Sequence, residues 1–408
     1  MVTPALTGGR EVNGAARSHG WRHQLPVYAP LSPGALLRAV GTAVVPGADP
    51  LAELRSLLVR DYRAEGALLT DSGTHALELA IRAGLETAGT RRIVALPAFT
   101  CYDVATAAVG ADADVALYDI DPETLAPEPA SLEAALKSGA GVVVVSPLYG
   151  IPVDWDAIEA LARRYDALVI EDAAQGHGAT WRDRPLGAHG RLSVLSFGRG
   201  KGWTGGAGGA LLWRDHGATP AADLSPNGAL STARTLIAAG AQWALGRPSL
   251  YHLPASLPWL GLGETHYREP SPPRAPGSSM AALVLATHAA ALREAAARRE
   301  RAAAIIGRLG VNVLTIRTPS GGVAGYLRLP IRVPGRAGAL VRQLHQLGVA
   351  PSYPTTLAEL PAIRARLATS RPATTPGADA LVRDLVTLPT HSRLRDSELR
   401  SLTSALGH

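Results

Sequence analysis

Lysine is nearly absent from this chain of 408 residues, although 40 of its residues are Lys or Arg. Only Lys137 and Lys201 are lysines, so arginine carries almost all of the positive charge. The amine of a lysine can form a Schiff base with an aldehyde, whereas a guanidinium keeps its proton near neutral pH and cannot. Lys201 lies in a glycine-rich stretch with hydroxyl side chains, residues 195–210, which suggests covalent chemistry with a phosphorylated cofactor. An ordinary surface lysine in a flexible loop is the alternative that this stretch alone leaves open.

Cysteine and long apolar runs are also scarce. The single cysteine, Cys101, excludes an intramolecular disulfide and fits a reducing compartment. Residues 1–20 have no apolar core of the kind that a signal peptide needs, and residues 1–25 are predicted to form a flexible lead-in. No uncharged apolar run reaches the roughly 20 residues needed to cross a bilayer. We therefore expect a soluble, cytoplasmic protein without a membrane span.

The composition favours a globular protein with a small anionic ligand. Hydrophobic residues make up 47% of the chain, enough to bury the core of one large domain plus a smaller one. The formal net charge is +6, but acidic and basic residues are interspersed and no basic run occurs. This mixture favours an anionic small molecule over nucleic acid as the partner.

Apolar strands and helices alternate along residues 66–213. Strands are predicted at 66–71, 92–97, 114–119, 141–146, 167–172, 192–197 and 208–213, with helices at 75–84, 102–110, 131–137 and 155–165 between the first five. Continuous apolar strands are buried on both faces, so the pattern predicts an α/β fold with a mainly parallel central sheet covered by helices. Ligands of such sheets bind beyond the carboxyl ends of the strands, where Ser72, Thr100, Asp172 and Gln175 lie.

The pattern changes after an irregular Pro- and aromatic-rich excursion at residues 247–277. A long helix at 278–309 is followed by predicted strands at 311–317 and 325–333 and helices at 337–347, 379–386 and 396–406. This change predicts a large domain over residues 26–277 and a smaller α+β domain over residues 278–408.

Four features in chain order match the needs of a pyridoxal phosphate enzyme. Residues 72–74, Ser-Gly-Thr, form a turn between a strand and a helix, where a phosphate can bind, although simple helix capping is the alternative. Asp172 ends an apolar strand, where a buried carboxylate favours a cation such as a protonated pyridine nitrogen. Ser196 adds a hydroxyl group and Lys201 the amine. Each feature is common by itself, but their combination predicts pyridoxal 5'-phosphate as the cofactor.

Several longer motifs carry a family resemblance. They are Asp71–Leu77, Leu96–Thr100, Asp119–Thr124, Leu148–Asp154, Ile170–Gly178, Leu195–Phe197, Lys201, Gly208–Gly209, Arg298–Glu300 and Leu388–His391. Through them the chain resembles, from about residue 25 to its end, the DegT/StrS-type family of pyridoxal-phosphate sugar aminotransferases. The resemblance implies the aspartate aminotransferase fold (fold type I) and a homodimer with active sites at the subunit interface.

The resemblance also implies roles for individual residues. Lys201 would form the Schiff base with the cofactor and move protons as a general acid and base. Asp172 would keep the pyridine nitrogen protonated, and Gln175 would contact the hydroxyl side of the cofactor. The phosphate would be bound by Gly73, Thr74 and Ser196.

The chain departs from the family at three places. The aromatic residue that stacks on the cofactor is replaced by Cys101, with Tyr102 next to it as a substitute candidate. Ala207 replaces the usual acidic residue before the final glycine pair. Thr265–Arg268 matches the family's Asn-Tyr-Arg segment only in part. These departures affect the acceptor side of the site most.

We therefore expect an aminotransferase that moves an amino group from an amino acid donor, L-glutamate, to a keto sugar that is nucleotide-linked, in glycan or secondary-metabolite biosynthesis. One alternative is a pyridoxal phosphate enzyme of the same fold that acts on a non-sugar carbonyl or catalyses a reaction other than transamination. A second is a catalytically silent regulatory homologue, which the retention of Lys201 disfavours.

Overall fold

A computed structural model describes residues 22–45, 47–215, 224–225, 229–252, 265–368 and 374–407. Residues 1–21 of the predicted lead-in and residues 253–264 of the predicted excursion lie outside this part of the chain.

The large core is built on a seven-stranded sheet with the strand order β1-β9-β8-β5-β4-β2-β3. Its strands are β1 (Gly66–Thr70), β2 (Ile93–Pro97), β3 (Asp114–Tyr118), β4 (Ala140–Val145), β5 (Leu168–Asp172), β8 (Leu192–Ser196) and β9 (Gly209–Trp213). β9 runs antiparallel to both of its neighbours, β1 and β8, and the other neighbouring pairs of this sheet are parallel. The predicted α/β fold with a mainly parallel, helix-covered sheet is confirmed.

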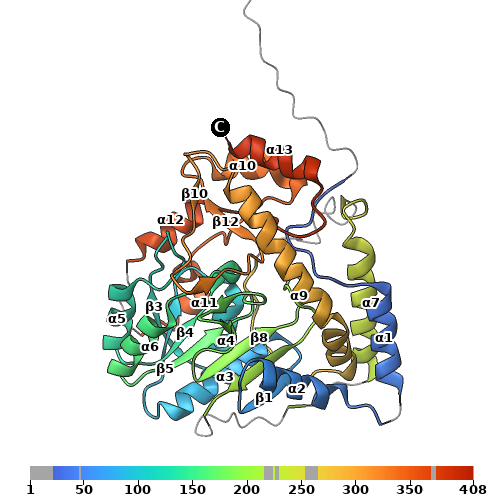
Figure 1. Ribbon diagram of the computed structural model, residues 1–408. Helices are drawn as coiled ribbons and strands as arrows, with labels where there is room; N and C mark the ends of the chain where they lie inside the picture. The colour runs from blue at the N-terminus through green and yellow to red at the C-terminus, as the bar shows by residue number, and fades with distance from the viewer. Residues whose placement is uncertain are drawn as a thin grey trace, which may run out of the picture.

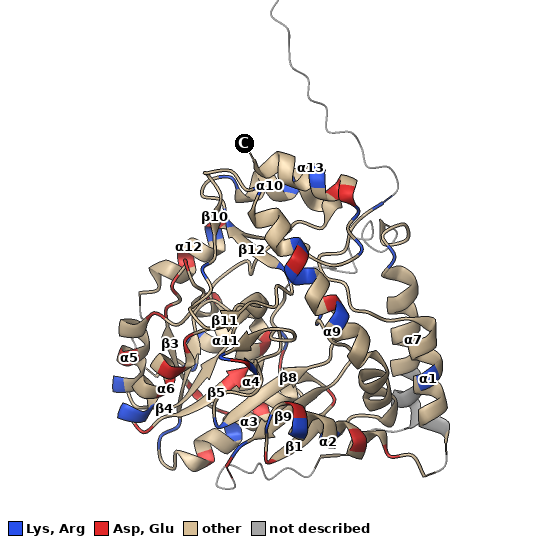
Figure 2. Cartoon of the chain, viewed as in Figure 1, with Lys and Arg blue, Asp and Glu red and all other residues tan. Residues whose placement is uncertain are grey.

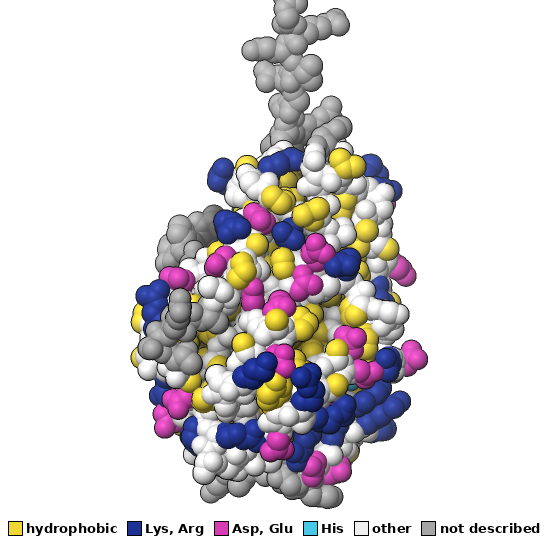
Figure 3. All heavy atoms as spheres, turned by 90° about the vertical axis from the view of Figure 1, so that its left-hand side faces the viewer, with side chains coloured by type: hydrophobic (Ala, Val, Ile, Leu, Met, Phe, Trp, Pro, Cys, Tyr) yellow, Lys and Arg dark blue, Asp and Glu magenta, His cyan; other side chains and the backbone are white. Residues whose placement is uncertain are grey.

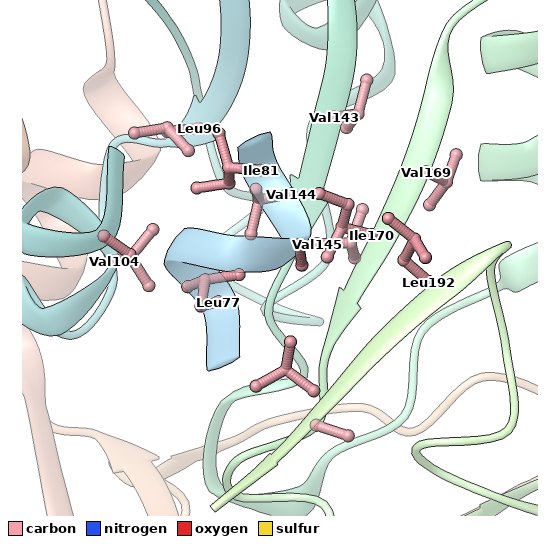
Figure 4. Close-up of a cluster of buried hydrophobic side chains, with 14 of the residues drawn as sticks. Leu77, Ile81, Leu96, Val104, Val143, Val144, Val145, Val169, Ile170 and Leu192 are labelled. Carbon is pink, nitrogen blue, oxygen red and sulfur yellow. The ribbon is translucent and has the colours of Figure 1, made fainter. Parts of the chain in front are cut away.

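Burial on both faces explains why these strands are so apolar. All six residues of β4, Ala-Gly-Val-Val-Val-Val, are buried. Figure 4 shows Leu77 and Ile81 lying against Val144 and Ile170 of the neighbouring strands. The helices that follow the strands are α3 (Gly73–Thr87), α4 (Tyr102–Gly110), α5 (Pro129–Lys137) and α6 (Trp155–Arg164). Basic and acidic residues are interspersed along the helices, and most of the central strands carry neither (Figure 2). The two kinds of charge are likewise mixed on the face shown in Figure 3.

A second, smaller core lies above the central sheet in Figure 1. Its four-stranded sheet has the order β10-β12-β14-β13. The elements around it are β10 (Leu314–Thr315), β12 (Leu329–Arg332), α10 (Ala337–Leu344), η4 (His345–Leu347), β13 (Ala350–Pro351), β14 (Leu385–Leu388) and α13 (Asp396–Leu406). The predicted helix at 379–386 runs too far, because α12 (Pro376–Asp384) stops and Val386 and Leu388 pair with β12.

The helix α9 (Ser278–Ile306) joins the two cores. Met280 and Val284 belong to the large core, whereas Ile305 is buried in the small one. By length and composition alone α9 could cross a membrane, but half of its most apolar stretch is buried inside the protein, as in a core helix.

Helices and short strands at the periphery complete the fold. They are α1 (Pro33–Val44), α2 (Pro50–Asp61), α7 (Ala229–Leu245), η1 (Leu148–Gly150), η5 (Leu357–Glu359), α11 (Pro361–Arg364), and the small sheet of β6 (Thr180–Trp181), β7 (Arg184–Pro185) and β11 (Gly322–Val323). The small sheet was not expected from the sequence, because two-residue strands carry no periodicity.

Candidate active site

A pocket with an empty volume of about 370 Å³ opens at the carboxyl ends of β5 and β8. It is lined by Gly73, Thr74, Leu77, Cys101, Asp103, Val104, Asp172, Ala174, Gln175, Ser196 and Lys201. Seven of the eight residues predicted for the site are in this lining, although they come from five separate segments of the chain.

The start of α3 forms one wall of the pocket. The Ser72 hydroxyl caps the helix by accepting a hydrogen bond from the backbone N–H of His75 at 3.1 Å. Gly73 packs so closely on Ser196 that a Cβ at position 73 would lie 2.7 Å from the Cβ of Ser196. The glycine therefore lets the free N–H groups and positive end of the helix reach the same space as the Ser196 hydroxyl, which suits a phosphate.

A carboxylate, Asp172, lies at the end of β5. Its Oδ2 accepts a hydrogen bond of 3.0 Å from the Ser146 hydroxyl, and its Oδ1 accepts one of 3.2 Å from the backbone N–H of Ala174. Burial raises the pKa of Asp172, while the positive charge of Lys201 and these hydrogen bonds oppose that increase. A cation bound beside Asp172 would further favour the ionised form.

Lys201 lies in the tight turn that follows β8. Its backbone N–H donates to the carbonyl of Gly198 at 3.3 Å, and Gly205 N–H closes the turn on the Phe197 carbonyl at 2.9 Å. Gly200 adopts a φ of +79°, which favours glycine. Within the described residues, Nζ of Lys201 has no hydrogen bond or ion pair. A partly buried amine is thus free to react in the pocket.

Gln175 connects the pocket to a pair of buried tyrosines. Its Oε1 accepts from the backbone N–H of Tyr149 at 2.9 Å, and its Nε2 donates to the Tyr353 hydroxyl at 2.9 Å. The rings of Tyr149 and Tyr353 stack with centroids 6.4 Å apart, and Phe99 meets Tyr353 edge-on at 5.3 Å. Tyr149 has a φ of +57°, a conformation that L residues rarely adopt. Tyr353 was missed in the sequence, because it lies 178 positions beyond Gln175 with no motif around it.

The structure separates the two candidates for stacking on a cofactor. Cys101 lines the pocket, whereas Tyr102 is not part of the lining: its hydroxyl bonds to Oγ1 of Thr355 at 2.6 Å and accepts from the Thr355 N–H at 2.9 Å. Burial, together with the nearby Asp103, raises the pKa of the Cys101 thiol to about 12. Cys101 is therefore a neutral contact surface rather than a nucleophile at neutral pH.

The other two departures from the family lie outside the lining. Ala207 is exposed in the glycine-rich turn. In the segment 265–268, the Arg268 carbonyl accepts a 2.7 Å hydrogen bond from Thr106 on α4.

The sequence model of the DegT/DnrJ/EryC1/StrS aminotransferase family matches residues 53–232. The predicted family resemblance is confirmed. This DegT/StrS region contains all seven of the lining residues that were predicted, and the predicted fold type I architecture is confirmed as well.

Two curated relatives and one solved structure illustrate what this chain is similar to. It is 38% identical over 146 residues to L-glutamine:2-deoxy-scyllo-inosose aminotransferase of Micromonospora echinospora, covering 36% of this chain and 34% of that protein. It is 32% identical over 176 residues to 3-amino-5-hydroxybenzoate synthase of Amycolatopsis mediterranei, covering 41% and 43%. The crystal structure of sugar aminotransferase CalS13 from Micromonospora echinospora has a TM-score of 0.70 at 22% identity, covering 93% of this chain and 98% of that one. The matched region thus spans about a third of the length of the first curated relative, while the fold extends over nearly the whole chain.

Proposed function

We propose that this protein is a pyridoxal-phosphate-dependent aminotransferase that moves an amino group from an amino acid to the keto group of a sugar or cyclitol. One observation carries the proposal. The amine of Lys201, unpaired within the described residues, shares a pocket with a partly exposed, hydrogen-bonded aspartate, Asp172, and with the hydroxyl and helix start at Ser196 and Gly73.

The pocket fits this cofactor part by part. Lys201 would hold the aldehyde carbon, and Asp172 would face the protonated ring nitrogen. The cofactor phosphate would be bound by Gly73, Thr74 and Ser196. Gln175 would contact the ring hydroxyl, and Cys101 would contact the ring face in place of an aromatic side chain.

When bound, pyridoxal phosphate stores the amino group and withdraws electrons from the carbon attached to the donor nitrogen. Asp172 would support this withdrawal by keeping a proton on the ring nitrogen, because an anion beside that nitrogen would stabilise its charged form. Lys201 Nζ, once free, would carry the proton that leaves the donor's α carbon. The hydrogen bonds from Ser146 and Ala174 favour the ionised form of Asp172 and so oppose the effect of burial, which raises its pKa.

The proposal extends to the identity of the amino donor and of the keto acceptor. The sequence favours L-glutamate and a nucleotide-linked keto sugar, whereas the name of the first relative gives L-glutamine and 2-deoxy-scyllo-inosose. Both donors and both kinds of acceptor therefore belong in the assay. The similarity to 3-amino-5-hydroxybenzoate synthase favours a second candidate, a reaction on a non-sugar carbonyl. Turnover of a non-sugar ketone with no turnover of any sugar or cyclitol ketone would favour that candidate.

We also propose that the active unit is a homodimer with both sites at the interface, as the family resemblance implies. Light scattering on the purified holoenzyme should give a mass twice that of one chain. A monomeric mass at assay concentration, with full activity, would contradict this.

The two lysines of the chain provide a matched test of the enzyme. The protein is purified with pyridoxal phosphate, and its visible absorption is recorded before and after adding L-glutamate or L-glutamine. Lys201→Ala should abolish the cofactor band, whereas Lys137→Ala should keep it, because Lys137 is an exposed helix residue paired with Glu133 at 3.5 Å. A wild-type protein without a Lys201-dependent band would refute the proposed function.

A further inference from the structure

The turn that carries Lys201 packs against helix α9, which joins the two cores (Figure 1). A Cβ at Gly202 would lie 2.7 Å from Nη2 of Arg298. A Cβ at Gly205 would lie 2.7 Å from Cγ2 of Val284. Glycine at both positions therefore lets the backbone of the turn approach α9 without a side chain between them.

Trp203, between these two glycines, bonds the turn to the helix. Its side chain is buried, and its Nε1 donates a 2.8 Å hydrogen bond to the Val284 carbonyl of α9. The Thr287 hydroxyl lies 3.0 Å from the Thr204 carbonyl, but it also lies within hydrogen-bonding distance of two carbonyls of its own helix. The indole N–H of Trp203, in contrast, has a single acceptor among the described residues.

The Trp203 ring also contacts aromatic rings from three other segments. Phe197, directly after β8, meets it edge-on with the ring centroids 5.2 Å apart. His177, two residues beyond Gln175, lies at 5.3 Å, and His288 of α9 stacks on it at 4.7 Å. Trp203 therefore connects the segments that follow β5 and β8 to α9.

Lys201 depends on this turn for its position. No hydrogen bond or ion pair fixes its Nζ in the part of the chain that the structure describes, and a lysine side chain is long and flexible. Gly200, beside it, has a φ of +79° and open space where a Cβ would lie. The backbone of the turn therefore sets where the amine can reach. Trp203 does not line the pocket, so it can influence the pocket only through the residues that it holds.

We propose that Trp203 is a positioning residue: by fixing the turn to α9, it holds the Lys201 amine at the place where the reaction needs it. This inference rests on the proposed function and adds the residue that orients its lysine. Proton transfer requires the amine within hydrogen-bonding reach of the reacting carbon, and a displacement of about 1 Å can lower the rate by about 100-fold. A tryptophan that only fills the core would affect the stability of the protein and leave the reaction unchanged.

Trp203→Phe tests the proposal, because it keeps an aromatic ring but removes the donor to the Val284 carbonyl. Loss of cofactor absorption in the holoenzyme is followed in single turnovers with L-glutamine and with L-glutamate. The rate constant should fall by about 10- to 100-fold. The half-saturating donor concentration should change by less than about threefold, because Trp203 is not part of the pocket lining.

A second readout needs no donor and no turnover. The apo-protein is mixed with pyridoxal phosphate, and the appearance of the Lys201-dependent band and its visible circular dichroism are recorded. In Trp203→Phe the band should form about 3- to 10-fold more slowly, because the lysine then has to be ordered as the cofactor binds. The circular dichroism of the band should be weaker, because the bound cofactor is held in more than one orientation.

Trp155→Phe is the matched control. Trp155 is also buried and outside the pocket lining, but its Nε1 has no partner among the described residues and its ring stacks on His189 at 5.3 Å. Both variants should lower the Tm, because each removes part of a buried side chain. Only Trp203→Phe should change the rate constant and the circular dichroism.

A lower Tm in Trp203→Phe with a wild-type rate constant and circular dichroism would assign Trp203 a structural role and overturn the inference. If Trp203→Phe does not fold, His288→Ala decides, because this half-buried residue contributes one of the rings around Trp203. It should lower the rate constant by about threefold, and wild-type values of both readouts would overturn the inference. Absence of a Lys201-dependent band in the wild type would instead refute the proposed function itself.

Discussion

The Ser146 hydroxyl donates a 3.0 Å hydrogen bond to Oδ2 of Asp172 and so joins the ends of two neighbouring parallel strands, β4 and β5. This bond stabilises the ionised carboxylate, whose pKa burial raises. The state of Asp172 therefore depends on a residue that does not line the pocket.

Ser146→Ala should shift the acidic limb of the pH–rate profile upward. Without the hydroxyl, the pKa of Asp172 rises further, so a higher pH is needed to ionise it. Because one hydrogen bond to a charged group is lost, we expect the acidic limb to move by roughly 1 to 2 pH units. The measurement is the donor half-reaction rate against pH, with the exposed Ser138→Ala as the control. An acidic limb at the wild-type position would show that this bond does not control the pKa of Asp172.

Gly73→Ala should impair cofactor binding and destabilise the protein. The new Cβ would lie 2.7 Å from the Cβ of Ser196 and 3.3 Å from its Cα, so the start of α3 and the end of β8 must separate. Overpacking of this kind costs about 1–3 kcal/mol. Gly41→Ala in α1 is the control: no atom lies within 4 Å of its new Cβ, and it should be neutral or stabilise by about 0.5–1 kcal/mol. Equal cofactor affinity in Gly73→Ala and wild type would contradict the close packing described for the pocket.

The Cys101 thiol should react slowly with alkylating agents although it lines a pocket. Burial and Asp103 raise its pKa to about 12, so the thiolate is rare below pH 9. We expect iodoacetamide to modify Cys101 at least about tenfold more slowly than free cysteine at pH 8, since rates follow the thiolate fraction. Mass spectrometry can follow the reaction without ambiguity, because the chain has one cysteine. Alkylation as fast as that of free cysteine would show that the thiol is neither buried nor protonated as described.

Three histidines with a lowered pKa should make the protein sensitive to acid. Burial lowers the pKa of His177 to about 3 and those of His189 and His391 to about 4. Each is neutral when folded but binds a proton when unfolded below about pH 6.5, so stability is full above that pH and falls as the pH drops toward 4. In this window each of these histidines lowers the free energy of unfolding by roughly 1.4 kcal/mol for each pH unit of acidification.

Urea unfolding at a series of pH values between 7 and 4 measures that slope. His189→Gln should reduce the slope by roughly 1.4 kcal/mol per pH unit, whereas His345→Gln, at an exposed position, should leave it unchanged. A free energy of unfolding that stays constant from pH 6.5 to 4.5 would contradict the burial of these groups in neutral form.

The sequence predicted the strands of the central sheet well because their apolar runs and intervening helices have clear periodicity. Asp172 and Lys201 line one pocket, as expected from the sequence, because β5 and β8 are neighbouring parallel strands whose carboxyl ends meet at the same edge of the sheet. The sequence could not show that Tyr102 lies outside the lining of the pocket, because the direction of the Tyr102 side chain depends on a hydrogen bond to Thr355, 253 positions away. The role of Cys101 stays a prediction.

Contacts formed by the end of the chain were the hardest to predict. Tyr353, which follows β13 of the small sheet, bonds to Gln175, 178 positions earlier, and nothing near Tyr353 in the sequence indicates a site. The helix prediction at 379–386 was wrong at its end because pairing with β12, rather than local preference, decides the structure of β14.

The pairing of β1 with β9 has a consequence for biosynthesis. β1 is an edge strand whose only partner in its sheet is β9, so Gly66–Thr70 has no strand to pair with until Trp213 has been made. At about 5–20 residues per second, the ribosome needs roughly 10 to 30 seconds to cover that interval. During this time the nascent chain exposes an apolar strand, and a chaperone that binds near β1 would protect the chain until the sheet can close.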